Sequence, residues 1–312
     1  MLVLLAIAAP AAAQLHGQPV RIIFPFAAGG SADALTRIIA DELSAGLGHA
    51  VIVEPRPGAA GRIGVQAVKA AEPDGHTLLM APIAPMAVYQ NVYPALEYDP
   101  VKDFLPISQV AAYEFGIAVG NDVPAKTLQE LVGWIKANPT HANYGTPGAG
   151  TLPHFFGVMF GGATGVPLQP IAYKGTAPAL TDLISGQIPI LFHAVGELAE
   201  MHKAGKIRVL ATSSRQRSSF LPEIPTFREA GYEVEGTGWY GLFAPTGTPE
   251  SLISLISKVV VAALARPDIR QRVLTLGVEP TGTSPEALAK IQHDDIDRWA
   301  PAVKASGFSP SQ

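Results

Sequence analysis

The chain has 312 residues, of which 48% are hydrophobic and 15% charged, and its formal net charge is −4. This much apolar material excludes extended disorder, and the length favours two domains over a single core. Lys and Arg are scattered along the sequence, so we expect no basic face and no nucleic-acid partner. The absence of Cys excludes disulfides, thiolate metal sites and a thiol nucleophile.

The N-terminus, MLVLLAIAAPAAAQ, has the pattern of a secretory signal. An apolar run from Leu2 to Ala9 precedes Pro10 and an Ala-x-Ala cleavage motif. We therefore expect residues 1–13 to be a signal peptide and the protein to be exported to the periplasm. Without a Cys to carry a lipid anchor, the mature protein is expected to be soluble. No later stretch has the roughly 20 apolar residues of a membrane helix.

Strands and helices alternate in the first part of the chain. The nearly continuous apolar run Val20–Phe24 predicts a strand buried on both faces. Ser31 is the expected N-cap of a helix over Ala32–Leu47. The same alternation predicts strands at 50–53 and 77–80 and a helix at 62–71. This order is typical of a parallel sheet covered by helices.

A second α/β unit is expected after a long strand at Ile107–Val119. Thr127 and Glu130 form a capping box that predicts the start of a new helix. Later patterns predict strands near 142–144, 168–172, 188–192 and 207–211, with helices from about 152 and over 177–185.

The end of the chain is expected to return to the first unit. A strand at Gly236–Ala244 leads back, and two helices beginning at Pro249 and Pro285 pack on that unit. We therefore predict two α/β domains with the ligand cleft between them. Domain 1 is discontinuous and covers 19–118 and 236–312, domain 2 covers 119–235, and the chain crosses near 115–122 and 228–244.

Two glycine-containing junctions could hold an anion. PFAAGGSAD runs from Pro25 to Asp33, and YGTPGAGTLPH runs from Tyr144 to His154. In both, glycines allow close backbone approach, and a helix start presents N–H groups with partial positive charge. Taken alone, the first junction fits a simple tight turn equally well. Because ligands bind at the carboxyl ends of parallel strands, we expect the two loops to face each other across a cleft.

Enzyme and cofactor motifs fail on detail. Gly148 and Gly150 resemble the start of a dinucleotide fingerprint, but Pro153 stands where the third Gly belongs. There is no G-x-S-x-G or H-E-x-x-H motif, and the His residues lack metal-ligand spacing. We expect no cofactor, no metal and no catalysis. His154 and His193 are favoured as cleft residues, and a cleft enzyme using them as acid–base groups is the alternative.

Taken together, these motifs resemble the Bug, or tripartite tricarboxylate transporter, substrate-binding proteins of proteobacteria. The resemblance runs from about Pro19 to Gly307 and also rests on AYKGTAPALTDLISGQ, on PEIPT, and on Trp239 followed by GLFAPTGTP. It implies a monomeric, type II periplasmic flytrap of two α/β domains joined by crossing strands. It also implies a small carboxylate ligand and, as partner, a tripartite membrane permease or alternatively a sensor protein.

In this family a ligand carboxylate lies between the two glycine loops, bound by backbone N–H groups, hydroxyls and waters. Carried onto this chain, the resemblance implies a shell of Phe26, Gly29, Gly30, Ser31, Asp33, Thr146, Gly148, Gly150, Thr151 and His154. We expect Asp33 to brace its loop or orient a water rather than touch the anion. Lys174 fits a cleft residue and a solvated turn residue equally well.

The chain departs from the family pattern after the strand at 188–192. Many relatives have an Asp where this chain has His193. An imidazole at the cleft wall should change which distal ligand group is accepted. It favours a second carboxylate or an aromatic acid over an amino group.

Overall fold

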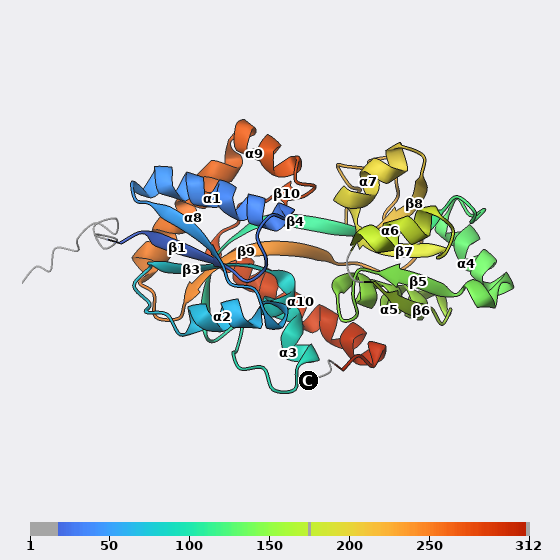
Figure 1. The fold of residues 1–312 in the computed structure, drawn as a ribbon, viewed down its shortest axis with the longest axis horizontal. Coiled ribbons are helices and arrows are strands. Elements are labelled where there is room, and N and C mark those ends of the chain that lie inside the picture. The colour runs from blue at the N-terminus through green and yellow to red at the C-terminus, as the bar shows by residue number, and fades with distance from the viewer. Residues whose placement is uncertain (1–17, 174–175, 310–312) are drawn as a thin grey trace, which may run out of the picture.

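The structure is a computed structural model that describes residues 18–173 and 176–309 (Figure 1). The predicted signal peptide and Lys174 lie outside the described residues. The strands follow the order β2-β1-β3-β9-β4-β7-β5-β6, and β8 and β10 also pair with β4. Their bounds are β1 Val20–Phe24, β2 Val51–Pro55, β3 Thr77–Pro82, β4 Phe104–Gly120, β5 Asn143–Thr146, β6 Gln169–Ala172, β7 Ile190–Ala194, β8 Ile207–Thr212, β9 Thr237–Pro245 and β10 Glu279–Pro280.

The first half of the sheet is mixed rather than purely parallel. Strands β1, β2 and β3 run parallel, as the alternation of strands and helices predicts. Strand β9 pairs antiparallel with both β3 and β4, so it closes the parallel part. The apolar side chains of β1 are almost fully buried because helices cover both faces of this half (Figure 1).

Two details of the predicted helices in this half are wrong. Helix α1 covers Ser31–Leu47, with Gly30 in the N-cap position and no side-chain cap, so Ser31 is its first residue and not the cap. Three helices rather than two end the chain, because α9 (Pro267–Leu274) lies between α8 (Glu250–Ala265) and α10 (Pro285–Ser306). The short α2 (Arg62–Lys69) and α3 (Tyr89–Val92) complete this half.

The second half contains strands β5 to β8 and the C-terminal part of β4. Its helices are α4 Leu128–Ala137, α5 Leu152–Thr164, α6 Thr176–Ile184 and α7 Val195–Lys203. Thr127 is confirmed as the cap of α4, since its side chain accepts from the Glu130 N–H at 3.2 Å. Helix α7 was not anticipated from the sequence.

Strand β4 runs through both halves of the molecule (Figure 1). Residues up to Glu114 pair with β9, whereas residues from Phe115 onward pair with β7 and β8. The chain returns beside it, because Ser213 donates its N–H to Phe115 and accepts from Gly236. This geometry agrees with crossing strands, while the predicted division into 19–118 plus 236–312 and 119–235 stays a prediction.

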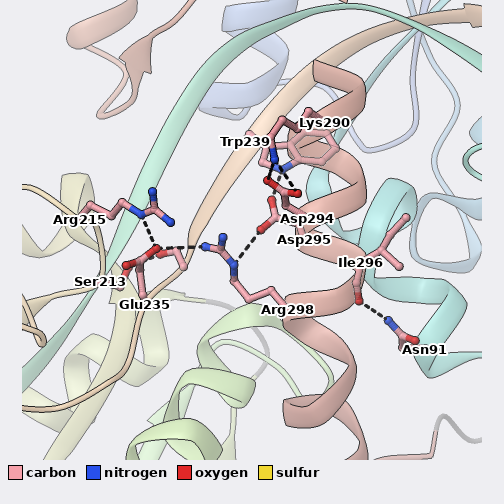
Figure 2. A network of polar contacts seen from close by, with 11 residues as sticks. Asn91, Ser213, Arg215, Glu235, Trp239, Lys290, Asp294, Asp295, Ile296 and Arg298 are labelled. Atoms are coloured by element: carbon pink, nitrogen blue, oxygen red, sulfur yellow. Dashed lines mark hydrogen bonds and ion pairs between the residues drawn. The ribbon is translucent and has the colours of Figure 1, made fainter. Parts of the chain in front are cut away.

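The long C-terminal helix α10 packs on both halves. Its Trp299 ring contacts Phe156 of α5 at 5.2 Å between ring centroids, and Phe156 contacts Phe115 of β4 at 4.8 Å. Figure 2 shows ion pairs beside this helix, in which Arg298 links Asp295 to Glu235, and Glu235 also pairs with Arg215. The two halves are therefore joined by packing and charge as well as by the strands.

Candidate ligand-binding cleft

A cavity of about 950 Å³ lies where the two halves meet. Its walls include the loop after β1, the loop before α5, the end of β7, helix α7 and the segment 274–278. Tyr113 and Phe115 of β4 and Tyr240 of β9 also line it, so the crossing strands form part of its wall. Most of the surface is apolar, and the polar groups are concentrated at the loop and helix ends. This combination is typical of a small-molecule site.

The first glycine loop leads into the start of α1 at the cavity. The first intrahelical hydrogen bond is donated by Ala34 to the carbonyl of Gly30 at 3.0 Å. The N–H groups of Ser31 and the next two residues therefore have no acceptor within the helix. Ser31 and Gly30 both line the cavity, so this positive helix end is available to an anion.

Asp33 braces this loop, as the sequence predicts. Its carboxylate accepts the Gly29 N–H at 3.1 Å and two hydrogen bonds from Arg37, at 3.0 and 3.2 Å. Gly29 has φ +99°, a backbone conformation that a side chain would disfavour. Burial acts to raise the pKa of Asp33, but the hydrogen bonds from Arg37 and Gly29 outweigh it and lower the pKa. The carboxylate therefore stays charged and committed to its partners.

The second glycine loop presents the start of α5. Thr151 occupies the N-cap position, but its hydroxyl donates to the Gly148 carbonyl at 2.7 Å instead of capping the helix. The Thr146 hydroxyl is hydrogen-bonded to the Thr151 hydroxyl at 3.0 Å. Phe155 makes the first intrahelical bond back to Thr151, at 3.2 Å. Residues 152 and 154 thus keep free N–H groups at the cavity end of α5.

His154 supports this loop from outside the cavity. Its Nδ1 accepts the Gly150 N–H at 3.0 Å, which requires that this nitrogen carry no proton. The ring stacks on Phe155 and meets the edge of Phe308, with centroids 5.4 and 6.0 Å away. Burial lowers the pKa of His154, so the ring is neutral near pH 7. It fixes the conformation of the loop and does not line the cavity.

His193 lies in β7 and lines the same cavity. Its Nδ1 accepts the Ala194 N–H at 2.6 Å, and its Nε2 is 2.7 Å from the Thr176 hydroxyl. The proton is therefore on Nε2, which donates to Thr176. Burial lowers the pKa of His193, while the charge of Glu197 opposes this change only in part. The residue is a neutral donor whose single N–H is already engaged.

An aromatic surface covers the strand side of the cavity. Tyr113 and Tyr240 face each other across β4 and β9 with ring centroids 5.2 Å apart. Tyr113 lies flat over Gly238, where any Cβ would come within 2.2 Å of the ring. Burial, with the Glu197 charge adding to it, raises the pKa of Tyr240 to about 12. Burial also raises the pKa of Tyr113, so both hydroxyls remain protonated near pH 7.

The structure brings most of the predicted site residues to one cavity. Those that line it are Phe26, Gly30, Ser31, Asp33, Gly150, Thr151 and His193. Gly29, Thr146, Gly148 and His154 lie behind these residues as supports. Lining residues that the sequence did not single out include Tyr113, Tyr240, Thr176 and Glu197.

Within the described residues, no group of three or more His, Asp or Glu side chains is arranged to hold a metal ion. Across the same residues, no helix is both long and apolar enough to cross a membrane. The polar groups of the cavity are helix starts, hydroxyls and a few charges. Such a set can hold an anion through neutral donors.

The fold is that of a periplasmic binding protein. It has two α/β halves joined by crossing strands, and helix starts from both halves reach the cleft between them. The family model described as "Tripartite tricarboxylate transporter family receptor" matches residues 35–308. The chain belongs to this family of solute-binding proteins.

Individual relatives are similar to this chain over nearly its whole length. The chain is 36% identical over 310 residues to a UPF0065 protein of Bordetella bronchiseptica, covering 99% of this chain and 92% of the relative. The structure of periplasmic binding protein BugD is similar at 33% identity and TM-score 0.76, covering 94% of this chain and 99% of that one. R. palustris Rpa4515 with adipate has 29% identity and TM-score 0.81, covering 95% of this chain and all (100%) of that one.

Proposed function

We propose that the protein captures a small carboxylate between the starts of α1 and α5. The observation that carries this proposal is the convergence of two uncapped helix ends on a single cavity, one from each half. Their free N–H groups and partial positive charges suit a carboxylate without a salt bridge. The similar protein Rpa4515 was solved with adipate, which supports a carboxylate as the ligand class.

Domain closure would complete the binding site around the anion. An open form binds it on one glycine loop, and bending near the crossing segments brings the other loop onto it. Residues Gly29, Thr146, Gly148 and His154 then act by holding the loops in shape. Lys174 stays a predicted contributor of positive charge.

We further infer that the mature protein is a monomer exported to the periplasm, where it delivers its ligand unchanged to the membrane subunits of a tripartite transporter. His154 has no free cavity-facing nitrogen, and the His193 proton is engaged by Thr176, so neither is set up as an acid–base group. Ligand uptake by cells that express those membrane subunits should require this protein. NMR of the released ligand should show no chemical change.

The test is a thermal-shift and calorimetric screen of the purified protein against carboxylates and their uncharged amides. A ligand at about 100 times its dissociation constant should add about 2.7 kcal/mol to the free energy of unfolding. The variant Gly30→Leu should abolish the response, because a Cβ there would meet no protein atom within 4 Å and Gly30 lines the cavity, so the added side chain should take up ligand space. Gly133→Leu on α4 is the matched control, with equally open surroundings away from the cavity. Binding of the amides as strongly as the acids would overturn the proposal.

A further inference from the structure

The wall of the cavity that α7 forms is acidic. Helix α7 places Glu197, Glu200 and Lys203 along it, so two carboxylates face one ammonium group. The Glu197 side chain is 54% exposed, and its Oε2 lies 4.0 Å from Nε2 of His193. Its charge reaches across the cleft, because it contributes to the raised pKa of Tyr240 on β9.

His193 does not cancel this charge. Because its Nδ1 accepts the Ala194 N–H, the ring would have to break that bond to become an imidazolium ion. Its remaining N–H points to the Thr176 hydroxyl at 2.7 Å. Thr176 accepts that bond and lines the cavity. Within residues 18–173 and 176–309, the ion-pair partner of Glu197 is the neutral His193, and Glu197 lines the ligand space as a hydrogen-bond acceptor.

The helix starts that reach the cavity thus differ in charge. The first turn of α5 contains no acidic residue. The first turn of α1 contains Asp33, whose carboxylate is already hydrogen-bonded to Arg37 and Gly29. At α7 the first-turn residue Glu197 itself supplies the negative charge that the helix end favours. The rings of Tyr113 and Tyr240 also line the cavity.

The geometry points to a ligand with one carboxylate and, at its far end, a hydrogen-bond donor such as a hydroxyl or ammonium group. This inference rests on the proposed carboxylate capture and names Glu197 as the residue that selects the far end. A second carboxylate would face Glu197 and Glu200, and like charges brought together across an interface are strongly disfavoured. The sequence favoured a second carboxylate opposite His193, but it did not place α7 beside that residue.

The experiment is a titration calorimetry series on two skeletons that differ only at the far end. The aliphatic set is hexanoate, 6-hydroxyhexanoate, 6-aminohexanoate and adipate. The aromatic set is benzoate, 4-hydroxybenzoate, 4-(aminomethyl)benzoate and terephthalate. On the skeleton that binds, at least one donor-bearing acid should bind at least about tenfold more tightly than the dicarboxylate. Tighter binding of the dicarboxylate would overturn the inference while leaving carboxylate capture intact.

Two variants test whether Glu197 determines ligand specificity or has only a structural role. Glu197→Gln should reduce the preference for the donor-bearing acid over the dicarboxylate by about tenfold, because the charge is lost while the shape is kept. Glu233→Gln is the control, since that side chain is 86% exposed and outside the cavity lining. An unchanged ratio in Glu197→Gln would remove Glu197 as the selecting residue. If no carboxylate of either set, and none in the wider screen, binds the wild type, carboxylate capture fails as well.

Discussion

The ring of Phe308 occupies the space into which a side chain at Gly150 would project. A Cβ added to Gly150 would lie 2.3 Å from Cε1 of Phe308. Phe308 follows helix α10, whereas Gly150 belongs to the glycine loop before α5. The end of the chain is therefore packed directly on one of the two loops that reach the cavity.

Gly150→Ala should destabilise the protein for two reasons. Its φ of +73° costs a side chain about 1 kcal/mol, and the new methyl group must displace the Phe308 ring. In a Phe308→Ala background only the first cost remains, so the substitution should be milder by about 1 kcal/mol. A double-mutant cycle in urea unfolding measures this coupling. Equal costs in the two backgrounds would show that the ring moves away freely.

The stability of the protein should fall on acidification through the titration of His154. Burial lowers its pKa in the folded protein below the ordinary 6.5. The unfolded chain then binds a proton that the folded protein does not, so the free energy of unfolding decreases as pH falls below about 6.5. The decrease ends once pH is below the folded pKa. His193, whose pKa is also lowered, adds to the same slope.

His154→Asn isolates this contribution. The Asn side-chain oxygen can still accept the Gly150 N–H, but the residue does not titrate. Urea unfolding between pH 7.5 and 5.5 should show a smaller slope in the variant than in the wild type, by up to about 1.4 kcal/mol per pH unit for one proton. A slope that does not change would mean that His154 titrates alike in the folded and unfolded chains.

Most strands and the α/β fold class were predictable from local sequence. Val20–Phe24 is apolar except for Arg21, and its bounds match β1, because a strand buried on both faces is a nearly continuous apolar run. Helix α7 was missed since it follows β7 directly, with Ala194 in the cap position and no side-chain cap. Helix α9 was missed for a similar reason, because only Arg266 separates it from α8 and no side chain caps it.

The candidate site was predictable where the signal is local. Glycines beside a helix start point to Gly30 and Thr151 without knowledge of the fold, and both line the cavity. Tyr113, Tyr240 and Glu197 reach the same cavity only because β4, β9 and α7 meet in space, and nothing in their neighbouring sequence announces it. His154 shows the reverse case, since its ring turns back to Gly150 and away from the cavity.

The Asp33 carboxylate should matter more for stability than its partner Arg37. Asp33 has a 7% exposed side chain, while that of Arg37 is 51% exposed. Asp33→Ala leaves the Gly29 N–H without an acceptor and should cost about 1–3 kcal/mol. Arg37→Ala should cost less than about 1 kcal/mol, and Asp33→Asn, which keeps an acceptor, should fall between them. Chemical denaturation of the three variants gives the order. A larger loss in Arg37→Ala would contradict the bracing role.

The buried pair of Trp239 and Asp295 depends on a hydrogen bond more than on a charge. Trp239 Nε1 donates to Asp295 Oδ2 at 2.8 Å, and both side chains are buried (Figure 2). Burial raises the pKa of Asp295, although the Trp239 hydrogen bond and the Arg298 charge oppose this rise. A raised folded pKa means that stability is greatest below the ordinary 3.8 and declines as pH rises through the folded value.

Asp295→Asn should therefore be at least as stable as the wild type at pH 7.5, because it removes the cost of a buried charge and keeps an acceptor for Trp239. Asp295→Leu removes that acceptor and should lose about 1–3 kcal/mol. Trp239→Phe, which deletes the donor instead, should lose a comparable amount at pH 7.5 and less at pH 4, because the raised pKa of Asp295 increases its protonated fraction there. Urea unfolding at both pH values measures all three. A loss in Asp295→Asn as large as that in Asp295→Leu would show that the Arg298 ion pair, and not the indole hydrogen bond, stabilises this contact.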